Sequence, residues 1–193
     1  MEDLKKIRKL YDLKTIYRDN PIQQRYESSA EHSWSAMLLA EYFMEIMDIE
    51  INRVKVFELL LYHDLAEIEI GDISLSDTEA RIEKKELEQK AVKRIASTLP
   101  ISMGTKYLEL YNEFENNKTL EARFANAMDK LDANLQCFNA SDTELEKIKK
   151  AFLPYPEHLI RERKQKYFVE FPEINDVFEK TLQFFRENGY FSE

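Results

Sequence analysis

A histidine followed directly by an aspartate interrupts an apolar helical pattern in the segment LLYHDLAEIEIGDI, at residues 60–73. His63 continues the apolar stripe of that helix, so the helical period aims its imidazole at the protein interior. Asp64 lies beside the same core, and a carboxylate there is costly unless it is paired or bound to a cation. The pair is therefore a candidate half of a metal site.

Two other segments contain side chains of the same kind. In SSAEHSWSAMLLAEYF, His32 shares a helical stripe with Ala36 and Phe43, so it also points inward. In LEARFANAMDKLDANLQCF, Asp129 and Asp132 flank an apolar stripe one turn apart. Either could reach a cation at the edge of the core, and the spacing alone does not choose between them. Two imidazoles with two carboxylates form a mixed nitrogen and oxygen ligand set, which suits manganese, iron, cobalt, nickel or zinc.

Such an ion would lower the pKa of a bound water molecule and polarise a phosphoryl oxygen, which is the chemistry of phosphate ester hydrolysis. The plainer alternative is a helical bundle whose inward histidines each give and accept one hydrogen bond within the core. A His-Asp dipeptide also arises by chance at this composition. The dipeptide alone therefore does not decide between the two.

Helices must position these side chains, because a 3.6-residue period dominates the chain and no convincing alternating strand appears. The pattern predicts helices over residues 2–14, 29–47, 53–66, 77–98, 104–115, 119–139, 142–152, 157–167 and 173–188. We expect an all-α fold, a single domain over residues 1–193 with about eight to nine helices. The C-terminal helices, at about 142–193, would pack on the rest of that domain.

Composition supports a compact helical protein. The chain has 44% hydrophobic and 34% charged residues, with three glycines and five prolines, and a chain of this length can bury about 70% of its unfolded surface. The net charge of −9 argues against a general nucleic-acid-binding surface. We expect neither a membrane span nor a secretory leader, because the apolar stretches are too short, and we therefore expect a cytoplasmic protein.

The C-terminal segment YFVEFPEINDVFEKTLQFFRENGYF, at residues 167–191, is rich in phenylalanine. This pattern is typical of a buried core, and part of it could also form an interface between two copies of the chain. On this ground we expect a homodimer.

The motifs quoted above resemble the HD-domain metal-dependent phosphohydrolases. His32, the pair His63–Asp64 and the distant Asp129 reproduce the H…HD…D order of that family. Within the family the chain is most similar to the branch of bacterial 5′-deoxynucleotidases, which remove phosphate from deoxyribonucleoside monophosphates. The resembling segments are LKTIYR (13–18), ESSAEHSW (27–34), YHDLAEIEIGDI (62–73), KKELEQKAVKRI (84–95) and DKLDANLQ (129–136).

The resemblance implies one divalent transition metal ion, which is cobalt, manganese, nickel, zinc or iron. Its implied ligands are His32, His63, Asp64 and Asp129. Asp129 is preferred to Asp132 because DKL at 129–131 aligns with the last-ligand motif of the family. Glu67, one turn after His63, would orient or deprotonate the attacking water, which needs a carboxylate within one hydrogen bond of it. The alternative for Glu67 is an exposed glutamate at a helix end.

The resemblance also implies substrate contacts. Arg18 would bind the phosphate, because a planar guanidinium can hold two oxygens and stabilise developing charge. Asp72, after Gly71, would face the substrate through a sugar hydroxyl or the ester oxygen, unless it belongs to an ordinary Gly-Asp turn. Ser74 lies in the following loop, where family members often have other residues, and is also expected to contact the substrate.

One departure from the family affects selectivity. Family members have an aromatic residue after the phosphate-binding arginine, where it helps to select the deoxyribose, and this chain has Asp19. Tyr17, Tyr26 or Trp34 could take its place, and the sequence does not choose among them. The preference for deoxyribose or ribose, and for the base, therefore stays open.

The leading function is a metal-dependent phosphomonoesterase that hydrolyses deoxyribo- or ribonucleoside 5′-monophosphates to nucleoside and phosphate. The alternatives within the family are a nucleotide triphosphohydrolase and a phosphodiesterase. From another class, the chain could be a nucleotide-binding regulatory module without turnover, although such a module has no need of Glu67. An oxygenase would need ligands for a second metal, and the remaining histidine, His158, is expected to be exposed.

Overall fold

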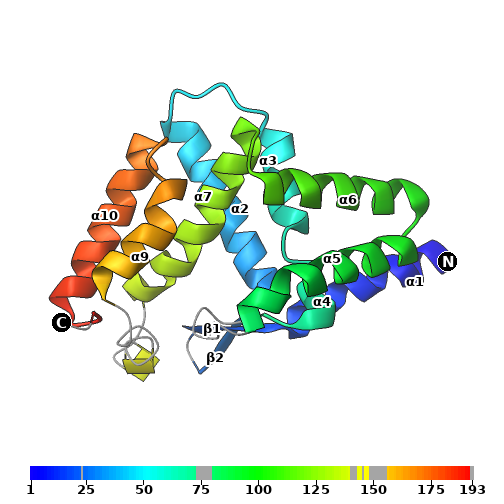
Figure 1. Cartoon of the computed structure of the whole chain (residues 1–193), viewed down its shortest axis with the longest axis horizontal. Helices are drawn as coiled ribbons and strands as arrows, with labels where there is room; N and C mark the ends of the chain where they lie inside the picture. The colour runs from blue at the N-terminus through cyan, green and yellow to red at the C-terminus, as the bar shows by residue number, and fades with distance from the viewer. Residues whose placement is uncertain (23, 73–79, 140–142, 145, 148–155, 192–193) are drawn as a thin grey trace.

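The computed structural model describes residues 1–22, 24–72, 80–139, 143–144, 146–147 and 156–191. Helices account for most of these residues, and a small two-stranded sheet joins them (Figure 1). The predicted all-α class is confirmed. No helix in the described ranges is both long and apolar enough to cross a membrane.

The elements follow the predicted helices closely, with differences at two places, the strands at 17–28 and the break after Tyr62. In chain order they are α1 (Glu2–Arg8), the 3-10 helix η1 (Lys9–Thr15), β1 (Tyr17–Ile22), β2 (Arg25–Ser28), α2 (Ser29–Ile46), α3 (Arg53–Tyr62), α4 (Glu67–Ile70), α5 (Ala80–Thr98), α6 (Ile101–Asn116), α7 (Leu120–Leu135), η2 (Gln136–Asn139), α9 (Glu157–Lys164), η3 (Gln165–Tyr167) and α10 (Pro172–Glu187). The helix expected at 142–152 lies largely outside the described residues.

The expectation that no strand is present was wrong. Strands β1 and β2 form an antiparallel hairpin in which Tyr17 pairs with Ser28 and Ile22 pairs with Arg25, with an irregularity between the two pairs. The inward positions of β1 include polar residues, Arg18 and Asn20, which alternate with exposed ones. A search for alternating apolar residues therefore gave no signal here.

The helix predicted over 53–66 ends four residues early. Helix α3 stops at Tyr62, turns occupy 63–66, and the short helix α4 begins at Glu67. The apolar pattern continues through Leu65 and Ala66, both of which are buried, so the periodicity did not mark the break. As a result His63 and Asp64 lie at the junction between two helices.

The core lies where α2, α3 and α7 pack against one another, with α6 against α3 and α7. The predicted stripes are buried, including Ala36, Ala40 and Phe43 on α2 and Phe124, Met128 and Leu131 on α7. Helix α10 packs on α7 (Figure 1). Its phenylalanines Phe178 and Phe185 are fully buried, as are Phe168 and Tyr190, so the aromatic C-terminal segment is core.

Helix α2 begins with a capping box. The Ser28 side chain accepts a hydrogen bond from the backbone N–H of Glu31, and the Glu31 carboxylate accepts one from the backbone N–H of Ser28. Two amides that would otherwise lack partners are satisfied in this way. Arg25 also binds Glu31 with both terminal guanidinium nitrogens, Nη1 and Nη2. This cap fixes the first turn of α2, which presents His32 to the interior.

Gly104 in α6 packs directly against α5. A Cβ atom at this position would overlap the backbone carbonyl oxygen of Ala96. We predict that Gly104→Ala lowers the free energy of unfolding by about 1–3 kcal/mol, because the backbone overlap outweighs the better helix propensity of alanine. Urea denaturation measures this, with Ser102→Ala at an exposed position of the same helix as the control. An equal or greater stability of Gly104→Ala would contradict the close approach.

Candidate metal centre

Four predicted side chains converge from three parts of the chain. His32 comes from the first turn of α2, His63 and Asp64 from the junction after α3, and Asp129 from α7. The His32 Nε2 atom lies 3.1 Å from Asp129 Oδ1 and 3.9 Å from Asp64 Oδ2. The His63 Nε2 atom lies 3.2 Å from Asp64 Oδ2 and 4.0 Å from Asp129 Oδ1. Each imidazole therefore faces both carboxylates.

These separations match the spacing around a single ion. Ligand atoms that each lie about 2.1 Å from a common metal are separated from one another by roughly 3–4 Å. The nitrogen to oxygen distances here run from 3.1 to 4.0 Å, and ligand atoms of His32, His63 and Asp129 all lie within 4.8 Å of one another. Side chains with this spacing could share one divalent ion.

The hydrogen bonds of His63 leave one ring nitrogen for such an ion. Its Nδ1 atom lies 2.8 Å from the carbonyl oxygen of Leu60, and because a carbonyl only accepts, Nδ1 must carry the proton. The Nε2 atom is buried and makes no hydrogen bond within the described part of the chain, although Asp64 Oδ2 is 3.2 Å away. A buried lone pair without a donor is costly, and a metal ion would satisfy it.

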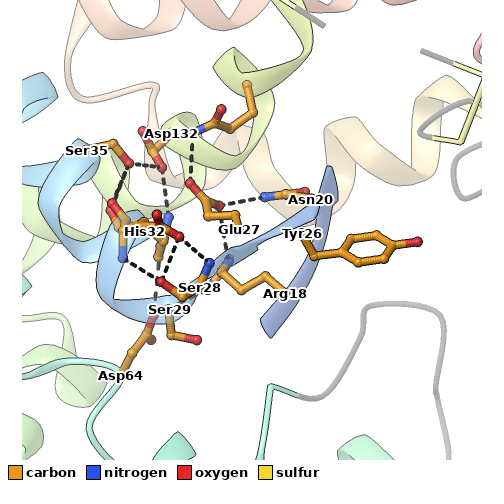
Figure 2. A network of polar contacts seen from close by, with 12 residues as sticks. Arg18, Asn20, Tyr26, Glu27, Ser28, Ser29, His32, Ser35, Asp64 and Asp132 are labelled. Carbon is orange, nitrogen blue, oxygen red and sulfur yellow. Dashed lines mark hydrogen bonds and ion pairs between the residues drawn. The ribbon is translucent and has the colours of Figure 1, made fainter. Parts of the chain in front are cut away.

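His32 is oriented by a second carboxylate, that of Asp132. The His32 Nδ1 atom donates to Asp132 Oδ2 at 2.8 Å, and the Ser35 hydroxyl donates to the same oxygen at 3.0 Å (Figure 2). Asp132 thus lies on the Nδ1 side of the ring and Asp129 on the Nε2 side. Asp129 is therefore the aspartate on the side of the ring that faces His63 and Asp64. A carboxylate behind a metal-binding histidine commonly fixes its ring orientation.

The charges around the centre are strongly coupled. Burial and the Arg18 guanidinium act to lower the pKa of His32, but its hydrogen bonds to Asp129 and Asp132 raise it to about 10. Burial would raise the pKa of Asp64, yet the neighbouring His63 and Arg18 hold it well below its usual value. The carboxylates thus stay ionised and draw positive charge into the core. A bound cation would take over that role from the His32 proton.

Glu67 lies at the start of α4, beside these groups, and is buried. Its Oε2 atom accepts a hydrogen bond of 2.6 Å from the hydroxyl of Ser29, at the start of α2. Burial, together with the negative charges of Asp64 and Asp72, raises the pKa of Glu67 to about 9. Glu67 therefore holds its proton at neutral pH in the metal-free protein, and a cation bound beside it would favour the ionised carboxylate that a general base needs. The alternative of an exposed helix-end glutamate was wrong.

Arg18 reaches the centre from strand β1. Its Nη1 atom donates to Asp64 Oδ2 at 3.3 Å, and its Nε atom lies 3.9 Å from Glu27 Oε2. Glu27 is buried and accepts a hydrogen bond from Gln136 at 2.8 Å. It also accepts one from Asn20 at 3.4 Å (Figure 2). The sequence pattern did not identify this polar wall of Asn20, Glu27 and Gln136, although Glu27 opens the ESSAEHSW motif.

Asp72 belongs to the same electrostatic neighbourhood. It follows Gly71, whose φ of 75° is one that residues with a side chain rarely adopt. The Asp72 carboxylate raises the pKa of both Arg18 and Glu67, so its charge lies close to the centre. Ser74 lies outside the described residues.

The aromatic residues suggested in place of Asp19 do not join Arg18. Tyr17 and Asp19 occupy the exposed positions of β1, which alternate with Arg18. The Tyr26 ring points away from the polar network in Figure 2, and 61% of the Trp34 side chain is exposed. The residue beside Arg18 on the inward side of β1 is Asn20.

His158 is exposed on α9, as predicted.

Comparison with known proteins identifies relatives of this chain. A model of the HD domain family matches residues 10–168. The human protein named 5′-deoxynucleotidase HDDC2 is 33% identical over 129 residues, which is 67% of this chain and 60% of the human protein. The protein 5′-deoxynucleotidase YBR242W of Saccharomyces cerevisiae is 30% identical over 65% of this chain and 52% of its own length. The matches thus span little more than half of these relatives.

A solved structure shares the fold over the whole chain. It is described as a predicted metal-dependent phosphohydrolase from Magnetospirillum magnetotacticum and is 26% identical in sequence. The two superimpose with a TM-score of 0.81, over 100% of this chain and 95% of the other. Together with the buried His and Asp cluster, this similarity supports a site for a divalent metal ion.

We predict that added manganese or cobalt raises the melting temperature of the chelator-treated protein, because the bound ion offsets the desolvation cost of the buried carboxylates. His63→Gln should abolish most of this shift, since it removes the unsatisfied nitrogen. His158→Gln, at the exposed histidine, is the matched control and should keep it. Differential scanning calorimetry with and without metal gives the comparison. Equal shifts in the two variants would exclude the buried cluster as the metal site.

Proposed function

Because this chain belongs to the HD domain family, we propose that it is a metal-dependent phosphomonoesterase that hydrolyses deoxyribo- or ribonucleoside 5′-monophosphates to nucleoside and phosphate. The main support is the convergence of two imidazoles and two carboxylates beside a buried glutamate and an arginine. The names of the human and yeast relatives agree with a nucleotide substrate.

We propose that His32, His63, Asp64 and Asp129 hold one divalent transition metal ion, which is cobalt, manganese, nickel, zinc or iron. When bound, such an ion lowers the pKa of water and neutralises charge on a phosphoryl oxygen. Leu60 and Asp132 would set the two imidazole orientations through the hydrogen bonds at Nδ1. Both nitrogens that face the centre would then be Nε2.

Glu67 is the proposed general base. Its carboxylate would accept the proton of the attacking water as the new bond to phosphorus forms, and the Ser29 hydroxyl would hold the Oε2 atom in place during this step. The burial of Glu67 keeps bulk water from competing for that proton. A neutral glutamine here would bind Ser29 equally well but could not take up a proton.

Arg18 is the proposed phosphate ligand. Its guanidinium stays charged because the carboxylates of Asp64, Asp72 and Glu67 raise its pKa, against the effect of burial. It would bind phosphate oxygens and stabilise the charge that develops as the ester bond breaks. Asp72 would contact a sugar hydroxyl or the ester oxygen, and Ser74 would contribute a further substrate contact.

Other activities in this family remain distinguishable from the proposed one. A triphosphohydrolase would act on nucleoside triphosphates and release inorganic triphosphate. A phosphodiesterase would hydrolyse cyclic nucleotides to monophosphates. A regulatory module would bind a nucleotide without turnover. The buried glutamate with a raised pKa beside the centre favours a hydrolase over such a module.

We also propose that the chain acts as one HD-type domain, as a homodimer in the cytoplasm. The contacts of α10 and η3 with α7 support a single domain. The rings of the C-terminal segment that are buried in the core do not offer the dimer surface that the sequence suggested.

Glu67→Gln should lower kcat by roughly 10²–10⁴-fold, the usual contribution of a general base, with little change in metal content. Glu69→Gln, at an exposed residue of the same short helix, is the matched control. Phosphate release is measured from ribo- and deoxyribonucleoside mono- and triphosphates with manganese, cobalt, nickel, zinc or magnesium. Absence of turnover with every metal, or full activity of Glu67→Gln, would refute the mechanism.

A further inference from the structure

Glu27 is a buried carboxylate that has no part in the proposed reaction. It is the third residue of strand β2 and comes directly before Ser28, the cap of helix α2. Only 1% of Glu27 is exposed. An ionised carboxylate in such a position is costly unless hydrogen bonds and a charged partner offset the loss of water. The contacts of its two oxygens indicate what the carboxylate does.

Two amides hold the Glu27 carboxylate in place. The Gln136 side chain, which follows the last residue of α7, donates to Oε1 at 2.8 Å. The Asn20 side chain, on strand β1, donates to Oε2 at 3.4 Å (Figure 2). The carboxylate is therefore fixed by donors from two other parts of the fold. Both donors are neutral, so the charge itself still needs a cation.

Arg18 supplies that cation. Its Nε atom lies 3.9 Å from Glu27 Oε2, which is too long for a hydrogen bond but close enough for an ion pair. The same Nε atom is buried and makes no hydrogen bond in the ranges that the structure describes. A buried N–H without an acceptor is costly, and a small movement of the guanidinium toward Glu27 would remove that cost.

Glu27 and Asp64 contact different sides of the Arg18 guanidinium. Glu27 lies nearest to Nε, whereas Asp64 Oδ2 accepts a hydrogen bond from Nη1 at 3.3 Å. The terminal nitrogens match the spacing of two phosphate oxygens. A hold on Nε keeps these nitrogens directed at the centre. Without it, the planar group could turn toward Asp64, and a phosphate would meet it in the wrong orientation.

A second metal ion is the alternative role for Glu27. Ligand atoms of Glu27, His32 and Asp132 lie within 4.8 Å of one another. The hydrogen bonds argue against an ion there. The His32 Nδ1 atom donates its proton to Asp132, so it has no lone pair for a metal, and the amides of Asn20 and Gln136 already donate to both Glu27 oxygens. These contacts favour a carboxylate that serves a cationic side chain.

We infer that Glu27 is a positioning residue for Arg18. Its carboxylate holds the Nε side of the guanidinium, so that the terminal nitrogens receive the substrate phosphate in one orientation. Asn20 and Gln136 fix the carboxylate before the substrate arrives, which avoids the cost of ordering it during binding. The inference rests on the proposed role of Arg18 as the phosphate ligand, and it does not depend on which nucleotide is hydrolysed.

A double-mutant cycle shows whether Glu27 acts through Arg18. We expect Glu27→Gln to weaken the binding of inorganic phosphate to the manganese-loaded protein by roughly 10–100-fold, because a misplaced group loses much of its effect. In an Arg18→Ala background the same change should cost less than about twofold, since residues that act as a unit are not additive. Isothermal titration calorimetry measures both affinities. Glu50→Gln, the same change at an exposed residue between α2 and α3, is the matched control and should bind phosphate normally.

Folding and metal content separate this role from a structural one. Circular dichroism and the manganese content should be the same in Glu27→Gln as in the wild type. If Glu27→Gln does not fold, Gln136→Leu takes its place in the cycle, because it loosens the carboxylate but keeps its charge.

Several outcomes would overturn the inference. They are an unchanged phosphate affinity in Glu27→Gln, an equal loss with and without Arg18, a wild type that does not bind phosphate, and a second metal ion that Glu27→Gln removes. Phosphate release from nucleoside monophosphates, measured in parallel, tests the reaction separately. Phosphate binding that needs both Arg18 and Glu27 in a protein without turnover would refute the reaction alone.

Discussion

The interaction on which the structure depends is that between buried carboxylates and the positive charge that they require. Asp64 and Asp129 are ionised at the edge of an apolar core, and Glu67 lies beside them. Isolated carboxylates could not remain charged there, since the desolvation cost is too large. His32, from α2, and Arg18, from β1, supply the compensating charge and hydrogen bonds. The helices are thus held in register by electrostatics as well as by packing.

Helix α2 connects the parts of the molecule that matter most. Its capped first turn places Ser29 against Glu67 and His32 against both Asp129 and Asp132. Its inward face then packs into the core against α3 and α7.

Much of this arrangement could be predicted from the sequence, because inward stripes at a helical period locate both histidines and both candidate aspartates. The break after Tyr62 could not, since the apolar pattern runs through it. The hairpin that holds Arg18 could not be predicted from alternating apolar residues, because inward positions of its first strand are polar. The role of Asp132 depends on which side of the His32 ring it occupies, and one-turn spacing does not specify that. The aromatic C-terminal segment was correctly predicted as core, since Phe168, Phe178, Phe185 and Tyr190 are buried.

The central claim is that one metal ion binds among the buried His and Asp side chains and takes the place of the proton on His32. Anomalous diffraction from a crystal of the protein loaded with cobalt or manganese tests it most directly. The account predicts a single strong peak within about 2.0–2.3 Å of His32 Nε2, His63 Nε2 and one oxygen each of Asp64 and Asp129. A peak elsewhere, or carboxylates that bind only protein atoms in the presence of metal, would contradict it.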